Sequence, residues 1–507
     1  MSYKRCRVIE PTIIARMHKI SKRFPGVVAN DHIDFDLKEG EVHALLGENG
    51  SGKTTLMNIL YGLLKPDEGE IYIYGKKVSL HSPSDAIACG IGMVHQDFKL
   101  IPSFTVAENI ALCRQSLKGF KIGEARSNAV DLMKKYEISD VDLDAETQEL
   151  PAHEQQLVEI MKMLCLGQKI LIFDEPTSVL AGDQKDILLE RLRKLAKMGH
   201  SIVFISHKLD EVLAVSDRVT VLRKGKVVGC LETSKANKKA LVTMMVGRDM
   251  PELSKSQSKK GGRCVEVQNL EVLSDRGITA VKDTSFYIQK GEILGIAGVA
   301  GNGQVELVEA ITGIRKVTSG KVVISKCDVT NASARRIIDM GVGYIPPKPK
   351  ETGVASTLPI TENIILRDYS PQFYHRSLFF SLKNMSRYAR KIITEYNIVT
   401  PSENLPVSHL SGGNLMKLIV AREIAHEPEV LISFDPSLGL DVGSIEFVHK
   451  KIIEARENTA ILLVSTDLDE VLALSDRIAV IFRGRVKEAP EGFSREKLGL
   501  MMTGEEG

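Results

Sequence analysis

Several features common in proteins are scarce or missing in this sequence of 507 residues. It has no tryptophan, only 5% aromatic residues, and no uninterrupted apolar run near the roughly 18 residues that a membrane-spanning helix needs. The N-terminal residues include Lys and Arg but no continuous apolar stretch, so we expect no secretory signal. The charges nearly cancel, with 67 Lys and Arg against 65 Asp and Glu, which argues against a nucleic-acid-coating protein and predicts no nucleic-acid partner.

The cysteines are few and scattered. None forms a C-x-x-C pair, and their number is odd, so neither a disulfide framework nor a zinc site is indicated. We expect reduced, mostly buried thiols in a cytosolic protein, and the sequence gives a single redox-active cysteine no supporting neighbour. The seven cysteines are Cys6, Cys89, Cys113, Cys165, Cys230, Cys264 and Cys327.

The sequence does contain an internal repeat. KEGEVHALLG (38–47) matches QKGEILGIAG (289–298), and ISHKLDEVLAVSDRV (205–219) matches VSTDLDEVLALSDRI (464–478). A period of about 250 residues is too long for a solenoid and indicates two homologous domains in tandem. We therefore predict domains at 11–250 and 264–507, joined by the polar linker PELSKSQSKKGGR (251–263).

Within each domain, short apolar runs alternate with amphipathic stretches. HALL, ILIF and IVFIS are typical of buried strands, whereas QKDILLERLRKLAKMG (184–199) has helical periodicity. This alternation predicts an α/β fold with a mainly parallel sheet flanked by helices.

A phosphate-binding loop is indicated by GENGSGKT (47–54), which fits G-x-x-x-x-G-K-[ST]. A strand-like run precedes it and a helix-like run follows, so backbone N–H groups and the helix N-terminus converge on phosphate oxygens. Lys53 is expected to reach the β- and γ-phosphates and Thr54 to bind Mg²⁺. The predicted nucleotide-binding residues of this loop are Gly47, Glu48, Asn49, Gly50, Ser51, Gly52, Lys53, Thr54 and Thr55.

Two adjacent carboxylates follow the apolar run of KILIFDEPTS (169–178). Asp174 at the end of a buried strand is placed to bind Mg²⁺ beside the phosphate loop. Glu175 is placed to polarise the attacking water. His207 ends the next apolar run, where a lone histidine is more often structural, but its spacing suits a γ-phosphate contact. Gln96 also follows a short apolar run and by itself indicates nothing.

Together these residues resemble the ATP-binding cassette superfamily over nearly the whole chain. The resemblance implies two tandem P-loop NTPase domains, each with a mainly parallel sheet, an antiparallel β subdomain and a helical subdomain. It implies ATP and Mg²⁺ as ligands, with Gln96 sensing Mg²⁺ and the membrane partner and His207 contacting the γ-phosphate. Phe24 occupies the place of an aromatic residue that stacks on adenine, although a buried Phe at a strand end is nearly as good an explanation.

The second domain has lost most of these groups. Gln304 stands at the Lys position and Val305 at the Thr position of its loop GVAGNGQV (298–305). A neutral amide cannot replace an ammonium against triphosphate, and Val offers no metal ligand. Aligning LISFDPS (431–437) with the first domain puts Phe434 and Asp435 at the two carboxylate positions. With Thr466 opposite His207 and Pro347 opposite Gln96, this domain is predicted to hydrolyse ATP poorly or not at all.

The signature segment shows the opposite pattern. The second domain has LSGGN (410–414), close to the family's LSGGQ, so Ser411, Gly412 and Gly413 are predicted to contact nucleotide. The first domain has LPAHE (150–154) there, where Pro151 lacks an N–H. Family members pair two cassettes head to tail. One composite site would therefore keep every part, and the other would be degraded in both halves.

This pattern resembles the fused ATP-binding proteins of ribose, galactose and xylose importers, and GIGMVHQDFKLIPSFTVAENIAL (90–112) is closer to the nucleoside branch. The resemblance implies the motor subunit of an ABC importer, peripheral to the cytoplasmic face of the inner membrane. Two transmembrane permeases and an extracytoplasmic solute-binding lipoprotein would complete it. The alternative is a tandem-cassette ATPase acting on ribosomes, although such proteins keep two intact loops and signatures. A DNA-repair ATPase would show zinc pairs or heptads, which are missing.

Overall fold

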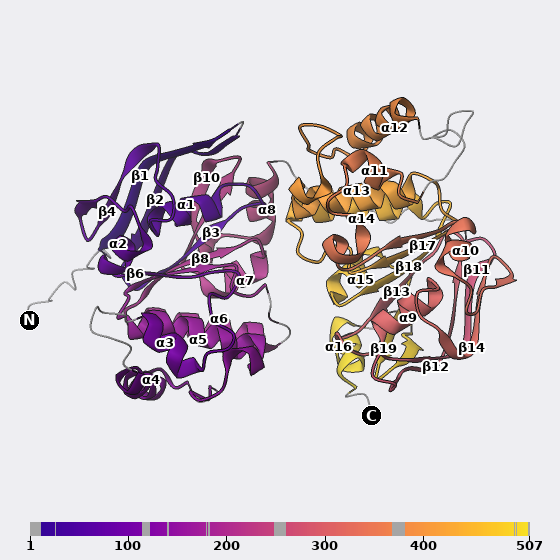
Figure 1. The fold of residues 1–507 in the computed structure, drawn as a ribbon, viewed down its shortest axis with the longest axis horizontal. Coiled ribbons are helices and arrows are strands. Elements are labelled where there is room, and N and C mark those ends of the chain that lie inside the picture. Colours follow the sequence, from indigo (N-terminus) through magenta and orange to yellow (C-terminus); the bar gives the residue numbers. More distant parts are fainter. Residues whose placement is uncertain are drawn as a thin grey trace, which may run out of the picture. The chain divides into compact units, whose positions relative to one another are not determined.

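The computed structural model describes residues 12–25, 27–113, 122–138, 141–178, 180, 183–247, 260–367, 381–490, 492 and 494–504. The chain divides into two compact units, Met1–Met250 and Pro251–Gly507. Most of the expected linker, residues 251–259, lies outside the described residues. Each unit combines the same kinds of layers in the same order along the chain (Figure 1).

In the first unit a six-stranded sheet has the order β10-β9-β3-β8-β7-β6. Adjacent strands of this sheet pair in parallel, except that the edge strand β10 pairs antiparallel with β9. β3, β7 and β8 are buried along their whole length, which explains their unbroken apolar sequences, because a parallel sheet is covered on both faces. Its strands are β3 (Val42–Leu46), β6 (Ile91–Val94), β7 (Ile170–Asp174), β8 (Ser201–Ser206), β9 (Arg218–Arg223) and β10 (Lys226–Glu232).

A second, antiparallel sheet of the first unit has the order β2-β1-β4-β5. The apolar residues of β1 and β2 form one core cluster with α1 and the inner strands of the parallel sheet. Its strands are β1 (Ile13–Phe24), β2 (Val27–Lys38), β4 (Glu68–Ile73) and β5 (Lys76–Val78). The α-helices described in this unit are α1 (Lys53–Leu60), α2 (Pro83–Ala88), α3 (Val106–Cys113), α4 (Ile122–Tyr136), α5 (Ala152–Cys165), α6 (Asp183–Lys197), α7 (Leu209–Val215) and α8 (Lys238–Val246).

The second unit repeats this plan. Its six-stranded sheet has the order β16-β17-β18-β13-β19-β20 and its antiparallel sheet β12-β11-β14-β15. The strands are β11 (Arg263–Leu273), β12 (Thr279–Gln289), β13 (Ile293–Ala297), β14 (Val317–Ile324), β15 (Cys327–Asp328), β16 (Val342–Ile345), β17 (Val430–Phe434), β18 (Ala460–Ser465), β19 (Arg477–Phe482) and β20 (Arg485–Glu488). The α-helices described are α9 (Gln304–Ile311), α10 (Ala334–Asp339), α11 (Ile360–Ile364), α12 (Leu382–Glu395), α13 (Gly412–Ile424), α14 (Val442–Ala455), α15 (Leu468–Leu474) and α16 (Arg495–Thr503).

The predicted fold class is confirmed: both units are α/β, with a mainly parallel sheet, an antiparallel sheet and helices. None of the helices described has the length and apolar character needed to cross a membrane.

The expectation of mostly buried thiols is wrong for the cysteines described. Cys165 is buried, three others are half-buried, and Cys230 and Cys327 are exposed. The physical reason is their position: Cys230 lies on the edge strand β10 and Cys327 on the edge strand β15, where little structure covers the side chains. Cys6 lies outside the described residues.

The core of the first unit gives a test of this packing. Ile172 is fully buried on β7, so Ile172→Ala is expected to lower the free energy of unfolding of this unit by about 2–5 kcal/mol. Ile187→Ala on the exposed face of α6 is the matched control and should change it by less than about 0.5 kcal/mol. Urea unfolding followed by circular dichroism would measure both, and equal effects would contradict the packing described.

Candidate functional site

The predicted phosphate loop connects β3 to α1 through a tight turn. Gly47 to Gly52 form the loop, and Lys53, Thr54 and Thr55 form the first turn of α1. Gly52 has a φ of 100°, and a Cβ there would lie 2.2 Å from the carbonyl oxygen of Ala29. Only glycine fits this position, because it combines left-handed backbone with backbone contact.

The interior of the loop is built for an anion. Lys53 Nζ is buried and donates to the carbonyl oxygens of Gly47 at 2.7 Å and Glu48 at 2.9 Å. The Ser51 hydroxyl oxygen is buried and has no hydrogen-bond partner in the described structure. A buried cation, an unsatisfied hydroxyl and a helix N-terminus in one loop are the groups that a phosphate would satisfy.

Asp174 ends β7 beside this loop. Its Oδ1 lies 3.4 Å from the Thr54 hydroxyl, which is a long, weak hydrogen bond. Burial, followed by repulsion from Glu175, raises the pKa of Asp174 to about 6. A buried carboxylate without a strong partner, next to an exposed hydroxyl, is the oxygen donor set that Mg²⁺ prefers, so the residues present fit the metal.

Glu175 and His207 are joined by a hydrogen bond. His207 Nδ1 donates to Glu175 Oε1 at 3.0 Å, and both side chains are largely buried. Burial favours a raised pKa for Glu175, but the hydrogen bond and charge of His207, with a contribution from Lys53, outweigh it and lower the pKa. Glu175 is therefore held as a carboxylate able to accept a proton or a hydrogen bond from water.

The remaining predicted residues of the first unit are more open. Gln96 lies two residues beyond β6, is exposed, and has no described contact with Thr54 or Asp174. It lines a cavity of about 300 Å³ together with Phe98, Leu100 and Pro102, among others. Phe24 ends β1 with 41% of its surface exposed, so the alternative of a buried strand-end Phe is wrong.

The loop of the second unit is closed on itself. Gln304 Nε2 donates to the Val299 carbonyl at 2.8 Å, and its Oε1 accepts from the Asn302 N–H at 3.0 Å. Val305 is 47% exposed where the first unit presents Thr54. The amide of Gln304 therefore satisfies groups within the loop and adds no positive charge.

The second carboxylate pair is altered in the way that the sequence alignment predicts. β17 ends at Phe434 as β7 ends at Asp174. Asp435 N donates to Val464 O at 2.8 Å, in the same way that Glu175 N donates to Ile205 O at 3.0 Å. Asp435 Oδ1 accepts from the backbone N–H of Thr466 at 2.7 Å and from its hydroxyl at 3.1 Å.

The two signature segments also differ as expected. Ser411 caps α13, and its Oγ accepts from Asn414 Nδ2 at 3.0 Å. A Cβ added at Gly412 would meet nothing within 4 Å, so this residue is open to close approach, whereas a Cβ at the buried Gly413 would lie 2.3 Å from Ser444 Oγ. Pro151 caps α5 without any side-chain hydrogen bond. Residues 179, 181 and 182 of the first unit lie outside the described residues.

One supporting cluster escaped the sequence reasoning. Glu211 is buried on α7 and accepts hydrogen bonds from Thr177 at 2.5 Å and Ser206 at 3.2 Å. This ties the segment after Glu175 to the segment before His207. In the second unit Glu470 accepts from Ser465 at 2.6 Å. The repeated LDEVLA sequence was the available signal, because its Glu is buried in both units.

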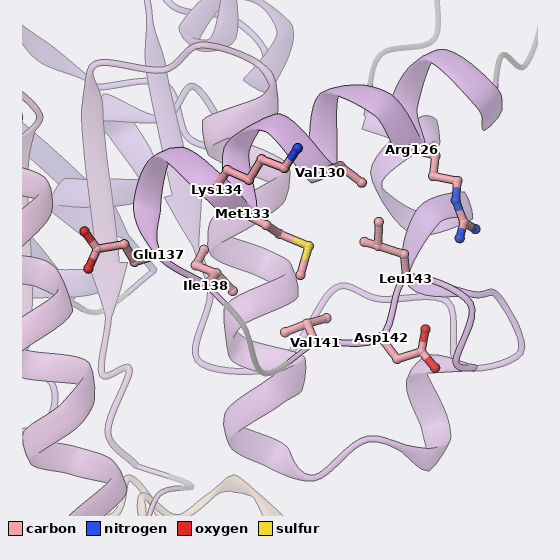
Figure 2. A pocket seen from close by; sticks show the side chains of 9 residues that line it. All are labelled: Arg126, Val130, Met133, Lys134, Glu137, Ile138, Val141, Asp142 and Leu143. Atoms are coloured by element: carbon pink, nitrogen blue, oxygen red, sulfur yellow. The ribbon is translucent and has the colours of Figure 1, made fainter.

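A separate cavity of about 550 Å³ lies between α4 and residues 141–143 (Figure 2). Val130, Met133 and Leu143 supply apolar lining, and charged side chains such as Arg126 and Lys134 lie at its edge. None of the predicted nucleotide or metal residues lines it, so it is distinct from the phosphate loop.

Comparison with known proteins agrees with this geometry. The profile of the family described as "ABC transporter" matches residues 30–178 and 281–437. The chain belongs to the ABC transporter family. Members are ATPases, so this chain is an ATP-binding ATPase with two cassettes.

Two relatives are similar to this chain over nearly their full length. The nucleoside import ATP-binding protein NupA of Lactococcus lactis is 42% identical, over 97% of this chain and 98% of that protein. The guanosine import ATP-binding protein NupO of Bacillus subtilis is 44% identical, over 97% of each. An archaeal ribosome recycling factor, aABCE1, aligns with a TM-score of 0.59 over 96% of this chain and 98% of that one. Its identity is only 20%, so it shows the shared fold alone.

The raised pKa of Asp174 can be tested by urea unfolding of protein freed of metal with EDTA. The folded pKa of about 6 exceeds the unfolded value of about 3.9, so wild-type stability falls as pH rises through that window. Asp174→Asn carries no charge at this position, so its free energy of unfolding at about pH 7.5 should exceed that of the wild type by roughly 2 kcal/mol. This difference in free energy of unfolding should disappear near pH 4. A difference independent of pH would contradict the raised pKa of Asp174.

Proposed function

We propose that this chain is the ATP-hydrolysing subunit of an importer for nucleosides or simple sugars. The observation that carries the proposal is a full-length similarity to import ATP-binding proteins, combined with one complete set of ATPase groups at a single loop. We place the two cassettes at 11–250 and 264–507, joined by 251–263.

The reaction is transfer of the γ-phosphoryl group of ATP to water. Lys53 would bind the β- and γ-phosphates, and the backbone N–H groups of 47–52 would surround their oxygens. Glu175, held as a carboxylate by His207, would orient the attacking water and accept its proton. His207 would then face the γ-phosphate, and Phe24 would stack on the adenine.

Thr54, Asp174 and Gln96 are the residues that would hold Mg²⁺. The bound metal would neutralise charge that develops on the phosphate oxygens during transfer. Gln96 would have to move toward Asp174 to join the shell, because it is exposed and without a described contact to it. That movement is the property expected of a residue that reports nucleotide binding to a partner.

The two units divide the labour. The first would bring Lys53, Asp174, Glu175 and His207. The second would bring the signature segment at the start of α13, where Gly412 is open and Gly413 is buried beside it. The proposed nucleotide-contacting residues of that segment are Ser411, Gly412 and Gly413. We propose intramolecular head-to-tail pairing, so that this helix start completes the site built on the first phosphate loop. Closure on ATP and release after hydrolysis would be the motor stroke.

Permease subunits would receive that stroke at the surface around Gln96. Its segment 97–104 places Ile101 at 40% exposure next to the 300 Å³ cavity, which gives a partner helix an apolar contact. Two permeases and an extracytoplasmic solute-binding lipoprotein would complete the complex on the cytoplasmic face of the inner membrane. The names of the two relatives, together with residues 90–112, favour nucleosides over sugars.

Replacing the proposed base tests which unit hydrolyses ATP. Glu175→Gln removes the proton acceptor and should lower turnover by at least about 100-fold. The matched variant Asp435→Asn changes the same position of the second unit and should leave turnover within about threefold, because its loop carries no cation. ATPase rates of the assembled complex would measure both. Activity surviving in Glu175→Gln, or lost only in Asp435→Asn, would contradict the assignment.

The importer role has its own test. The chain, co-expressed with its candidate permease subunits, should co-purify with them, and its ATPase rate in proteoliposomes should rise when a binding protein delivers a nucleoside. Ribose in place of the nucleoside is the control for solute choice. Recovery of the chain on ribosomes, with none bound to permeases, would overturn the importer role.

A further inference from the structure

A small cavity of about 140 Å³ lies in the second unit, between the start of β16 and the end of α13. Val342 lines it from the strand, and Arg422, Glu423 and His426 line it from the helix and the turn that follows. Arg367, which follows α11, also lines it. None of the residues proposed to bind ATP or Mg²⁺ does so, and this cavity is therefore separate from the ATPase site.

Arg422 is the unusual side chain of this cavity. Only 6% of its surface is exposed, and its Nε donates to Glu423 Oε1 at 2.9 Å. Its Nη1 is buried and has no hydrogen-bond partner in the described structure. Of all the N–H donors of this guanidinium, only the one on Nε has an acceptor within the described part of the chain. Buried donors without acceptors are costly, so this group is suited to a ligand with several oxygen atoms.

Both oxygens of Glu423 are already engaged. Its Oε2 accepts from the backbone N–H of Tyr344 at 3.0 Å and pairs with Arg367 Nη1. Two guanidinium groups therefore share one carboxylate, which leaves a net positive charge among these three side chains. Burial, followed by the charge of Arg367, lowers the pKa of Arg422 to about 10, so this side chain is still a cation at pH 7.

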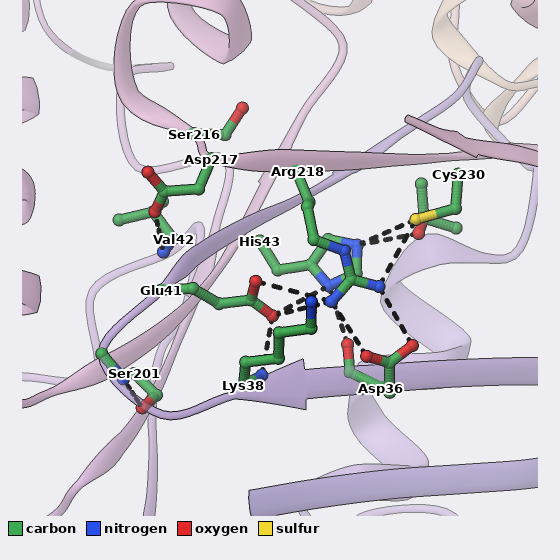
Figure 3. A network of polar contacts seen from close by, with 12 residues as sticks. Asp36, Lys38, Glu41, Val42, His43, Ser201, Ser216, Asp217, Arg218 and Cys230 are labelled. Atoms are coloured by element: carbon green, nitrogen blue, oxygen red, sulfur yellow. Dashed lines mark hydrogen bonds and ion pairs between the residues drawn. The ribbon is translucent and has the colours of Figure 1, made fainter. Parts of the chain in front are cut away.

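Arg218 of the first unit is a matched arginine for comparison. Its guanidinium pairs with the carboxylates of Asp36 at 2.9 Å and Glu41 at 3.1 Å (Figure 3). One cation there faces two anions, although 16% of the Arg218 side chain is exposed. Arg422 is more deeply buried, yet it shares its single carboxylate with Arg367. The carboxylate charge at this cavity is therefore too small to balance the two arginines.

The first unit also shows that the fold does not require this imbalance. Lys162 stands at the place of Arg422, because each lies ten residues after the first residue of its helix, α5 or α13. Lys162 Nζ donates to Glu159 Oε2 at 3.1 Å and to the carbonyl oxygen of Lys99 at 2.9 Å. The buried cation of the first unit thus has acceptors of its own, and the excess of donors belongs to the second unit.

We propose that this cavity binds a small oxyanion, and that inorganic phosphate is its ligand. The N–H donors of Arg422 would bind two phosphate oxygens side by side, which is the geometry that makes arginine suited to this group. Arg367 and His426 line the same cavity and would face the remaining oxygens. A volume of about 140 Å³ is below the roughly 300 Å³ at which pockets for larger ligands begin, so an intact nucleotide is too large.

Isothermal titration of the full-length protein with inorganic phosphate tests this proposal. Because the phosphate loop of the first unit also suits phosphate, the protein carries Lys53→Ala as a background change. We expect one phosphate per chain with a dissociation constant below about 1 mM. Adding Arg422→Met should weaken this binding at least about tenfold, because charge-assisted hydrogen bonds are lost. The matched variant Arg387→Gln removes an exposed arginine of α12 and should leave the dissociation constant within about twofold.

Three outcomes would overturn the proposal. They are no binding of phosphate up to about 10 mM, binding that Arg422→Met leaves unchanged, and binding of acetate as tight as that of phosphate, which would show a carboxylate site instead. Circular dichroism checks that Arg422→Met folds. If it does not, Arg367→Gln at the half-buried edge of the cavity takes its place and should weaken phosphate binding at least about threefold. An unchanged dissociation constant in that variant would overturn the proposal equally.

Discussion

Parallel pairing of β3, β8 and β7 is the constraint on which the ATPase site depends. In register, Leu46 lies opposite Ser206 and Asp174 opposite Ile205, so the three strands end at one edge of the sheet. The phosphate loop, the Asp174–Glu175 pair and His207 all leave from that edge. The three strands are buried along their length, so packing on both faces of the sheet holds this edge in place.

The second unit has the same scaffold without the lysine and the aspartate of the first unit. Its strands β13, β18 and β17 pair in parallel, and Asp435 makes the same backbone contact as Glu175, yet the loop contains Gln304 and the strand ends in Phe434. In the first unit, by contrast, the site leaves the Ser51 hydroxyl unsatisfied and buries Asp174 without a strong partner. These two groups can bind a ligand, and each of them lowers the local stability of the ligand-free protein.

Local sequence was sufficient to predict the strands, the phosphate loop and the residues missing from the second copy, because each depends on neighbouring residues and on the spacing of apolar residues. It was insufficient for Gln96, whose exposed position follows from the path of the loop after β6, and for Glu211, whose role needs two distant hydroxyls.

The self-contained loop of the second unit also bears on what a single substitution there would do. Gln304 Oε1 accepts from the Asn302 N–H, so a change to lysine would remove that acceptor and add a buried cation in a unit that has Phe434 at the position of Asp174. A change of Phe434 to Asp alone would bury an unpaired carboxylate. Each single substitution toward the residues of the first unit is therefore unfavourable, and a lysine and an aspartate would have to enter the second unit together to rebuild the pair that the first unit has.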